Sequence, residues 1–141
     1  MKDLARIARM LDEARLRVEP IPQFAGEEAL SAEEGYAVQA MGILLRTARG
    51  ERPAGWKMGL TSRAKMMQVG VSDVIVGRLT DAMRIEDGGS VPRSSYVHPR
   101  AEPEIAFLMG RELAGRVSAA EAFAAVEAVS PAIELIDSRF R

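Results

Sequence analysis

Glu102 and Glu104 are the residues whose type and spacing most clearly suggest chemistry. Side chains alternate between the two faces of an extended strand, so both glutamates would point the same way. Ile105, Phe107 and Met109 would then point to the other face. Two neighbouring carboxylates repel each other unless a positive group lies between them, and an oxygen-preferring divalent cation provides one. The pattern therefore predicts a metal site, and the alternative is a solvated acidic strand end without a function.

Two further charged residues lie inside apolar surroundings. Glu134 interrupts the apolar run 132–139, and a buried carboxylate needs a metal or an ionic partner, for which Arg139 is a candidate. Lys57 lies between large apolar residues in the segment 54–60. A lysine in such a segment either turns outward to solvent or reaches into a site.

Composition excludes several classes of function. Cysteine is absent, which excludes disulfides, thiolate catalysis and zinc–thiolate sites, and His98 is the only histidine. A lone histidine is more often structural, but this one directly precedes the acidic segment. The net charge of −1 gives no basis for binding nucleic acid or an anionic membrane. We therefore expect a cytoplasmic protein, with no signal peptide or membrane-spanning segment.

The first half of the chain is predicted to be mainly helical. Apolar residues recur at helical spacing over residues 3–18. Ser31 and Glu34 form a capping box that begins a second helix, and Gly50 is its predicted C-terminal cap. A short helix over 63–69 follows the extended segment around Lys57.

The second half mixes short strands with one helix. Residues 91–97 are a possible strand, and a second capping box begins a helix over 119–129. Pro131 is expected to close that helix, and a buried strand follows over 132–139. Short strands without regular alternation with helices predict an α+β fold.

The sequence resembles a known family over nearly its whole length. The matching segments are 55–62, 64–66, 68–71, 79–83, 98–107 and 131–139. They resemble 4-oxalocrotonate decarboxylases and 2-hydroxypentadienoate hydratases of the fumarylacetoacetate hydrolase superfamily. These lyases act late in the bacterial meta-cleavage catabolism of aromatic compounds.

The resemblance implies roles for individual residues. It makes Glu102, Glu104 and Glu134 the ligands of Mg²⁺, with Mn²⁺ as the alternative, and Lys57 the active-site lysine. Four further residues become candidates for substrate binding or for support around the metal ligands. They are Asp81, His98, Asp137 and Arg139.

The resemblance leaves the reaction open between two lyases. Hydratases carry an aspartate in the window 74–77, where this chain has Ile75, and this difference favours decarboxylation of 2-oxo-3-hexenedioate to 2-hydroxypenta-2,4-dienoate and CO₂. The segments 79–83 and 99–102 fit the hydratases at least as well. The alternative is therefore hydration of 2-hydroxypenta-2,4-dienoate to 4-hydroxy-2-oxopentanoate. The expected substrate is a small 2-oxo dicarboxylate or a 2-hydroxydienoate.

The resemblance also implies a larger fold than this chain contains. It implies an N-terminal helical region, 1–52, and the first part of a catalytic mixed β-roll, 53–141. Members of the family continue for about as much chain again. A homo-oligomer, or a complex with the partner hydratase or decarboxylase, is expected. The alternative of another class is a truncated or non-catalytic assembly subunit.

Overall fold

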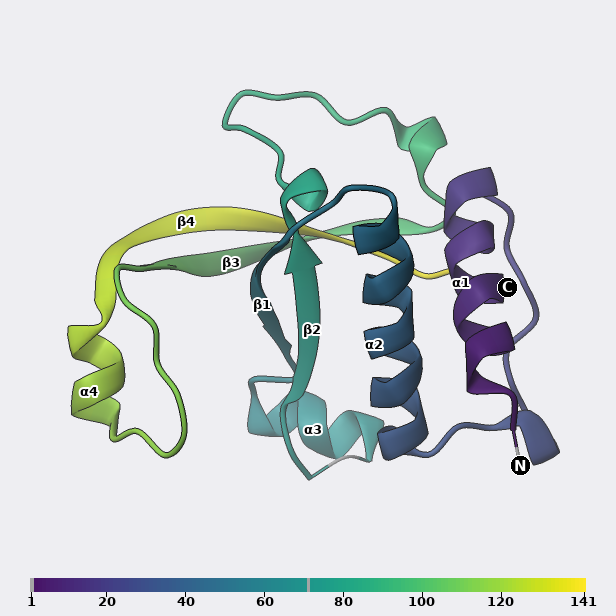
Figure 1. The fold of residues 1–141 in the computed structure, drawn as a ribbon, viewed down its shortest axis with the longest axis horizontal. Coiled ribbons are helices and arrows are strands. Elements are labelled where there is room, and N and C mark those ends of the chain that lie inside the picture. The colour runs from purple at the N-terminus through teal and green to yellow at the C-terminus, as the bar shows by residue number, and fades with distance from the viewer. Residues whose placement is uncertain (1, 71) are drawn as a thin grey trace. The chain divides into compact units, whose positions relative to one another are not determined.

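A computed structural model describes residues 2–70 and 72–141, so Val71, which ends one of the matching segments, lies outside the described residues. The chain divides into two compact units, Met1–Val97 with Arg139–Arg141, and His98–Ser138 (Figure 1). Both helices and strands are present, as the α+β expectation required. Assignment of residues 53–141 to a catalytic β-roll, separate from 1–52, stays a prediction. No helix among the described residues has the length and apolar character needed to cross a membrane.

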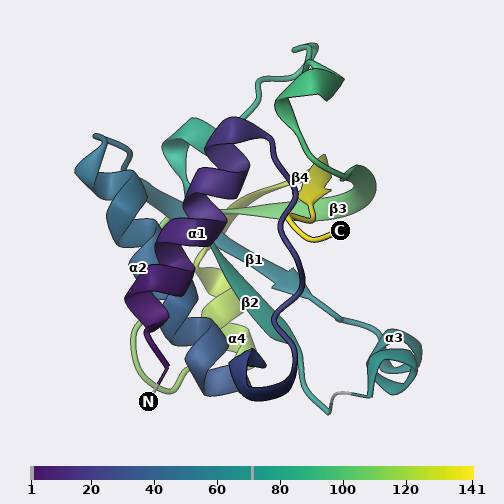
Figure 2. The same cartoon turned by 90° about the vertical axis from the view of Figure 1, so that its right-hand side faces the viewer.

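The first unit begins with two helices that pack against each other, as Figure 2 shows. They are α1 (Leu4–Arg17) and α2 (Ala32–Ala48). Ile7 and Ala8 of α1 and Val38 of α2 form the buried core of this pair. The predicted capping box at Ser31 is present. The apolar spacing of residues 3–18 therefore correctly predicted which face of the first helix is buried.

Two antiparallel strands complete the sheet of the first unit. They are β1 (Pro53–Gly59) and β2 (Ile75–Thr80), joined through α3 (Arg63–Val69). Helix α2 provides hydrogen-bond partners for the outer edge of β2. Tyr36 Oη accepts a hydrogen bond from the Val76 N–H, and the Gln39 amide donates to the Val76 carbonyl. Side chains that occupy an open strand edge in this way block its pairing with another chain.

The second unit is a long antiparallel ribbon with one short helix. Its elements are β3 (Pro99–Met109), α4 (Ala119–Ala124) and β4 (Val126–Asp137), and Figure 1 shows α4 at the end where the two strands connect. A register shift between Leu108 and Met109 interrupts the alternation of faces before Met109. Pro103 and Pro131 both lie inside the ribbon, where proline is tolerated because each strand has one open edge.

Two sequence-based predictions were wrong in this part of the chain. The helix expected over 119–129 ends at Ala124, because the residues from Val126 onward pair with β3, and this pairing overrides local helix propensity. Pro131 therefore lies within a strand and closes no helix. Residues 91–97 form no strand and instead contain a 3₁₀ turn over Arg93–Ser95, where the Arg93 guanidinium donates to the Tyr96 carbonyl.

The last residues of the chain are part of the first unit. Ile21 donates its N–H to the Arg139 carbonyl at 2.8 Å and accepts from the Arg141 N–H at 3.0 Å. The Phe24 and Phe140 rings meet edge to face, with centroids 5.6 Å apart. These contacts tie the C-terminal residues to the loop that follows α1.

A charged network joins the end of α2 to the end of β2. Arg46 is 8 % exposed and contacts Glu51 Oε2 at 2.6 Å, and the Thr80 hydroxyl, on a residue only 1 % exposed, donates to the same carboxylate oxygen.

Replacing Arg46 by methionine should lower the free energy of unfolding by about 3 kcal/mol, because the Glu51 charge would stay in place without its partner. Urea denaturation measures this loss. The exposed Arg52→Met is the control and should cost less than about 1 kcal/mol.

The same network predicts how stability depends on pH. Burial alone would raise the pKa of Glu51, but hydrogen bonds from Thr80 and Arg46 outweigh it and hold that pKa below its ordinary value of 4.5. The contribution to stability is therefore fully present above pH 4.5 and is lost as the pH falls through the folded-state pKa. Arg46→Met should lose less stability over this range than the unmodified chain. An equal loss in both proteins would contradict this assignment.

Candidate metal centre

The β3–β4 ribbon gathers the three glutamates on one of its faces. Glu102 lies directly opposite Glu134, and Glu104 lies opposite Ala132. Residues opposite each other in an antiparallel ladder share a face, and so do residues two apart on one strand. The register of this single ribbon therefore brings together all three carboxylates that the sequence analysis selected.

The three carboxylates are close enough to hold one cation. One oxygen of each lies within 4.8 Å of the others, and Glu102 and Glu134 are half-buried while Glu104 is exposed. Mg²⁺ binds oxygen at about 2.1 Å, which allows opposite ligands to be at most about 4.2 Å apart. Small side-chain rotations would close this difference.

The donor set fits a hard divalent cation. Three carboxylates offer only oxygen atoms, the ligands that Mg²⁺, Mn²⁺ and Ca²⁺ prefer. Three negative charges this close repel one another, and a bound divalent cation would offset that repulsion. An all-oxygen site of this kind is consistent with the predicted Mg²⁺ and does not suit zinc–thiolate or copper chemistry.

The opposite face of the ribbon is apolar. Ile105 and Phe107 of β3, with Val129 and Ile133 of β4, alternate with the acidic face and are all more than half exposed. The ribbon thus separates a charged face from an apolar one, as the alternation of Glu102, Glu104, Ile105 and Phe107 predicted.

His98 and Asp137 meet at the end of the ribbon. The backbone N–H of His98 donates to Asp137 Oδ1 at 2.6 Å, and the ring atom Nδ1 of His98 lies 3.3 Å from the Ser138 carbonyl oxygen. Asp137 lies three residues from Glu134, so strand alternation places it on the other face of the ribbon. Its hydrogen bond to His98 closes the strand end, and its expected role in orienting Glu134 stays a prediction.

Lys57 lies on the less exposed face of β1. Trp56 and Met58 point to the exposed face, whereas Lys57 and its neighbours Gly55 and Gly59 are half-buried. This half-burial fits both alternatives open from sequence, because a lysine stem can lie along a strand surface with its ammonium in solvent. The role of Lys57 as the active-site lysine stays a prediction.

Asp81 has a structural environment in the first unit. The Arg52 backbone N–H at 2.9 Å, with weaker help from its guanidinium and the Ala82 N–H, holds the pKa of Asp81 below its ordinary range. The carboxylate joins the end of β2 to the start of β1. Arg139 likewise contributes its backbone carbonyl to Ile21. Roles of Asp81 and Arg139 in substrate binding stay predictions.

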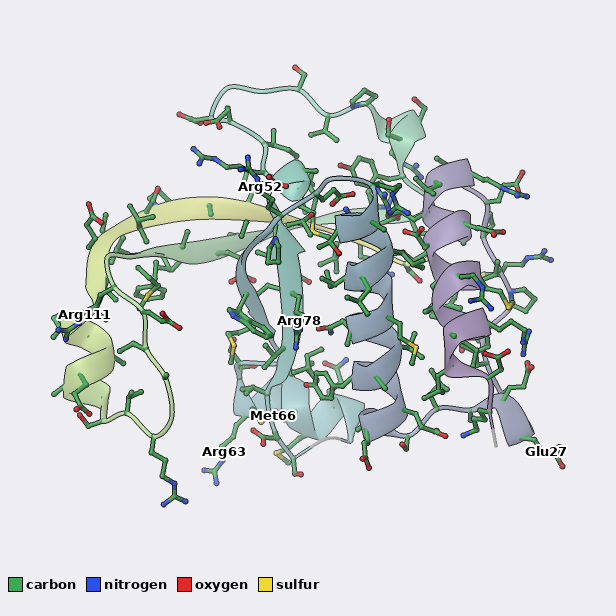
Figure 3. The ribbon with its side chains drawn as sticks, viewed as in Figure 1. Glu27, Arg52, Arg63, Met66, Arg78 and Arg111 are labelled. Atoms are coloured by element: carbon green, nitrogen blue, oxygen red, sulfur yellow. The ribbon has the colours of Figure 1, made fainter. Side chains whose placement is uncertain are left out.

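Two features of β1 and β2 were missed from sequence. Arg78 stacks over the Trp56 ring at 4.8 Å from its centroid, directly across the ladder, and Figure 3 labels Arg78 on β2. Gly77 lies directly opposite Lys57. A glycine inside a strand-like run is a sign of close approach by another group, and this sign was available in the sequence.

Comparison with known proteins finds enzymes whose sequences are similar to this chain. The chain is 52 % identical to a 4-oxalocrotonate decarboxylase from Pseudomonas sp over 98 % of its own length and 54 % of the relative. It is 40 % identical to a 2-hydroxypent-2,4-dienoate hydratase from Pseudomonas putida over 79 % of the chain and 51 % of the relative. No protein-family model matches.

Solved structures give the same relationship. 4-Oxalocrotonate decarboxylase from Pseudomonas putida G7, complexed with magnesium and adipate, superimposes with a TM-score of 0.91 at 35 % identity. The match covers 98 % of this chain and 53 % of that protein. A complex of the same enzyme with calcium and acetate gives a TM-score of 0.90.

The acidic face of the β3–β4 ribbon is thus an all-oxygen candidate site for a divalent cation. The chain is a homologue of 4-oxalocrotonate decarboxylases and of the hydratases related to them. It spans about half the length of the curated relatives it matches.

Proposed function

We propose that this chain forms part of a metal-dependent lyase that decarboxylates 2-oxo-3-hexenedioate to 2-hydroxypenta-2,4-dienoate and CO₂. The observation that carries the proposal is the cluster of Glu102, Glu104 and Glu134 on one face of the β3–β4 ribbon. Homology to enzymes of this name, one of them bound to magnesium and adipate, supports it. Adipate is a six-carbon dicarboxylate, as is the proposed substrate. The corresponding fold would be the β-roll of the fumarylacetoacetate hydrolase superfamily, with residues 53–141 as its first part.

The residues of this chain have distinct tasks in the reaction. Glu102, Glu104 and Glu134 hold the cation, which when bound supplies a Lewis acid for the 2-oxo oxygen of the substrate. The bond between C5 and C6 breaks and CO₂ leaves. The electron pair of that bond moves through the conjugated system to give a dienolate, which takes up a proton. The Lys57 ammonium pairs with a substrate carboxylate or with the developing negative charge on oxygen.

The surroundings of Lys57 favour decarboxylation over hydration. Ile75 of β2 lies on the same face of the β1–β2 ladder as Lys57 and next to it in register, at the window where hydratases carry an aspartate. An apolar side chain there adds no negative charge to oppose a departing carboxylate. Hydration needs a general acid or base that transfers the protons of water, and the side chain of Ile75 is neither.

Incubation with both substrates distinguishes the candidates. With Mg²⁺ and 2-oxo-3-hexenedioate we expect CO₂ and the dienol, and EDTA should abolish both products. Formation of 4-hydroxy-2-oxopentanoate from the dienol, without CO₂ release from the dicarboxylate, would instead establish the hydratase. Absence of both reactions and of Mg²⁺ binding would favour a non-catalytic assembly subunit.

A further inference from the structure

The β1–β2 ribbon carries glycine at three positions around Lys57, of which Gly55 precedes it by two residues on β1. Gly77 pairs directly with Lys57 across the ladder, and Gly59 follows two residues later on β1. Residues in these positions share one face of the ribbon. The face that carries Lys57 therefore lacks a side chain at all three of these neighbouring positions.

The stem of Lys57 occupies the space above Gly77. A Cβ atom at Gly77 would lie 2.7 Å from Lys57 Cγ and 2.8 Å from Cδ. Non-bonded carbon atoms prefer separations of about 3.5–4.0 Å, so an alanine at this position and the observed lysine conformer exclude each other. The φ angle of Gly77 is outside the left-handed region, so its backbone conformation does not itself require glycine.

The ammonium end of Lys57 lies beside Gly59. A Cβ atom at Gly59 would be 3.6 Å from Lys57 Nζ and 2.8 Å from Ile75 Cγ1. The lysine stem thus crosses the ribbon over Gly77, and its charged end lies next to Gly59.

We propose that Gly77 is a positioning residue for Lys57: the missing side chain at position 77 lets the lysine stem lie flat across the ribbon and directs its ammonium toward Gly59. The link to turnover rests on the proposed function, whereas the positioning itself does not. An alanine at position 77 should displace the lysine side chain and leave the paired strand backbone in place, because the side chain rotates more easily. Gly77→Ala should therefore fold normally, and reduced freedom of the unfolded chain favours it slightly.

Nuclear magnetic resonance of the lysine side chains tests the positioning directly. The chain has three lysines, Lys2, Lys57 and Lys65, so ¹³Cε-lysine labelling gives three signals, and Lys57→Met identifies one of them. We expect nuclear Overhauser contacts between the Lys57 stem protons and the Gly77 α-protons. Gly77→Ala should move the Lys57 signal. Gly55→Ala should leave it unchanged, because a Cβ atom at Gly55 meets nothing within 4 Å. Absence of the contacts, or equal effects of the two alanines, would overturn the proposal.

A double-mutant cycle tests the link to turnover. Displacing the ammonium by about 1 Å should lower kcat about tenfold or more, while KM and Mg²⁺ affinity change little. In a Lys57→Met background, Gly77→Ala should cause no further loss of kcat. A loss of the same size in both backgrounds would show that Gly77 acts through the fold and not through Lys57. If the unmodified protein catalyses neither reaction, the proposed function fails, and the resonance experiment still decides the role of Gly77.

Discussion

Replacing Glu134 by glutamine is expected to lower the Mg²⁺ affinity of this protein by about 100-fold or more, because loss of even a group that only supports a metal ligand costs about 10–100-fold. Glu134 lies opposite Glu102 on β4 and is half-buried, so its carboxylate contributes one of the three charges of the site. The amide has the same shape and keeps one oxygen, which isolates the effect of charge. Isothermal titration with Mg²⁺ measures the change.

Glu127→Gln provides the matched control for this experiment. Glu127 lies on the same strand, is exposed and is outside the cluster of three carboxylates. We expect its Mg²⁺ affinity to stay within about twofold of the unmodified protein, because exposed charges at a distance are screened by salt. Equal losses in Glu134→Gln and Glu127→Gln would mean that Mg²⁺ responds to overall charge and not to a site.

Replacing Lys57 by methionine is the second change with a large expected effect. It removes the ammonium and keeps most of the apolar stem. Loss of a group that stabilises charge in the transition state costs about 100–1,000-fold in kcat, and we expect a loss of this size here. Steady-state assays with 2-oxo-3-hexenedioate and Mg²⁺ measure it.

Mg²⁺ affinity separates this effect from loss of the metal site. Lys57 is not one of the three clustered carboxylates, and a lysine is not a ligand for Mg²⁺. Lys57→Met should therefore bind Mg²⁺ within about threefold of the unmodified protein. Lys65→Met, on α3, controls for removal of one positive charge from the same unit and should keep full activity. Normal turnover in Lys57→Met would remove this residue from the mechanism.

Local sequence predicts that Glu102 and Glu104 share a face of the ribbon, but it does not predict that Glu134 lies beside them. The alternation rule alone places Glu102 and Glu104 on one face. The position of Glu134 depends on the register between β3 and β4, which are separated in sequence by a loop and α4, and no local pattern determines that register. The family resemblance supplied this third residue, and the ladder gives the physical reason why it lies with the other two.

The capped starts of helices were predicted well, but element boundaries that depend on strand pairing were not, as the early end of α4 shows. Ser31 and Ser118 form the predicted capping boxes because these bonds are local. Residues from Val126 to Val129 follow a helix-favouring, alanine-rich segment, yet they pair with β3. Residues 91–97 are apolar at their ends but form a turn instead of a strand. The close approach of Lys57 to Gly77 likewise depends on strand pairing that sequence does not determine.

The most direct test of the account is titration of this protein with Mn²⁺, a paramagnetic substitute for Mg²⁺, followed by electron paramagnetic resonance. We predict one bound ion per chain with a dissociation constant below about 1 mM, competition by Mg²⁺, and loss of this binding in Glu134→Gln. Absence of saturable binding, or binding that Glu134→Gln leaves unchanged, would contradict the claim that Glu102, Glu104 and Glu134 form a metal centre.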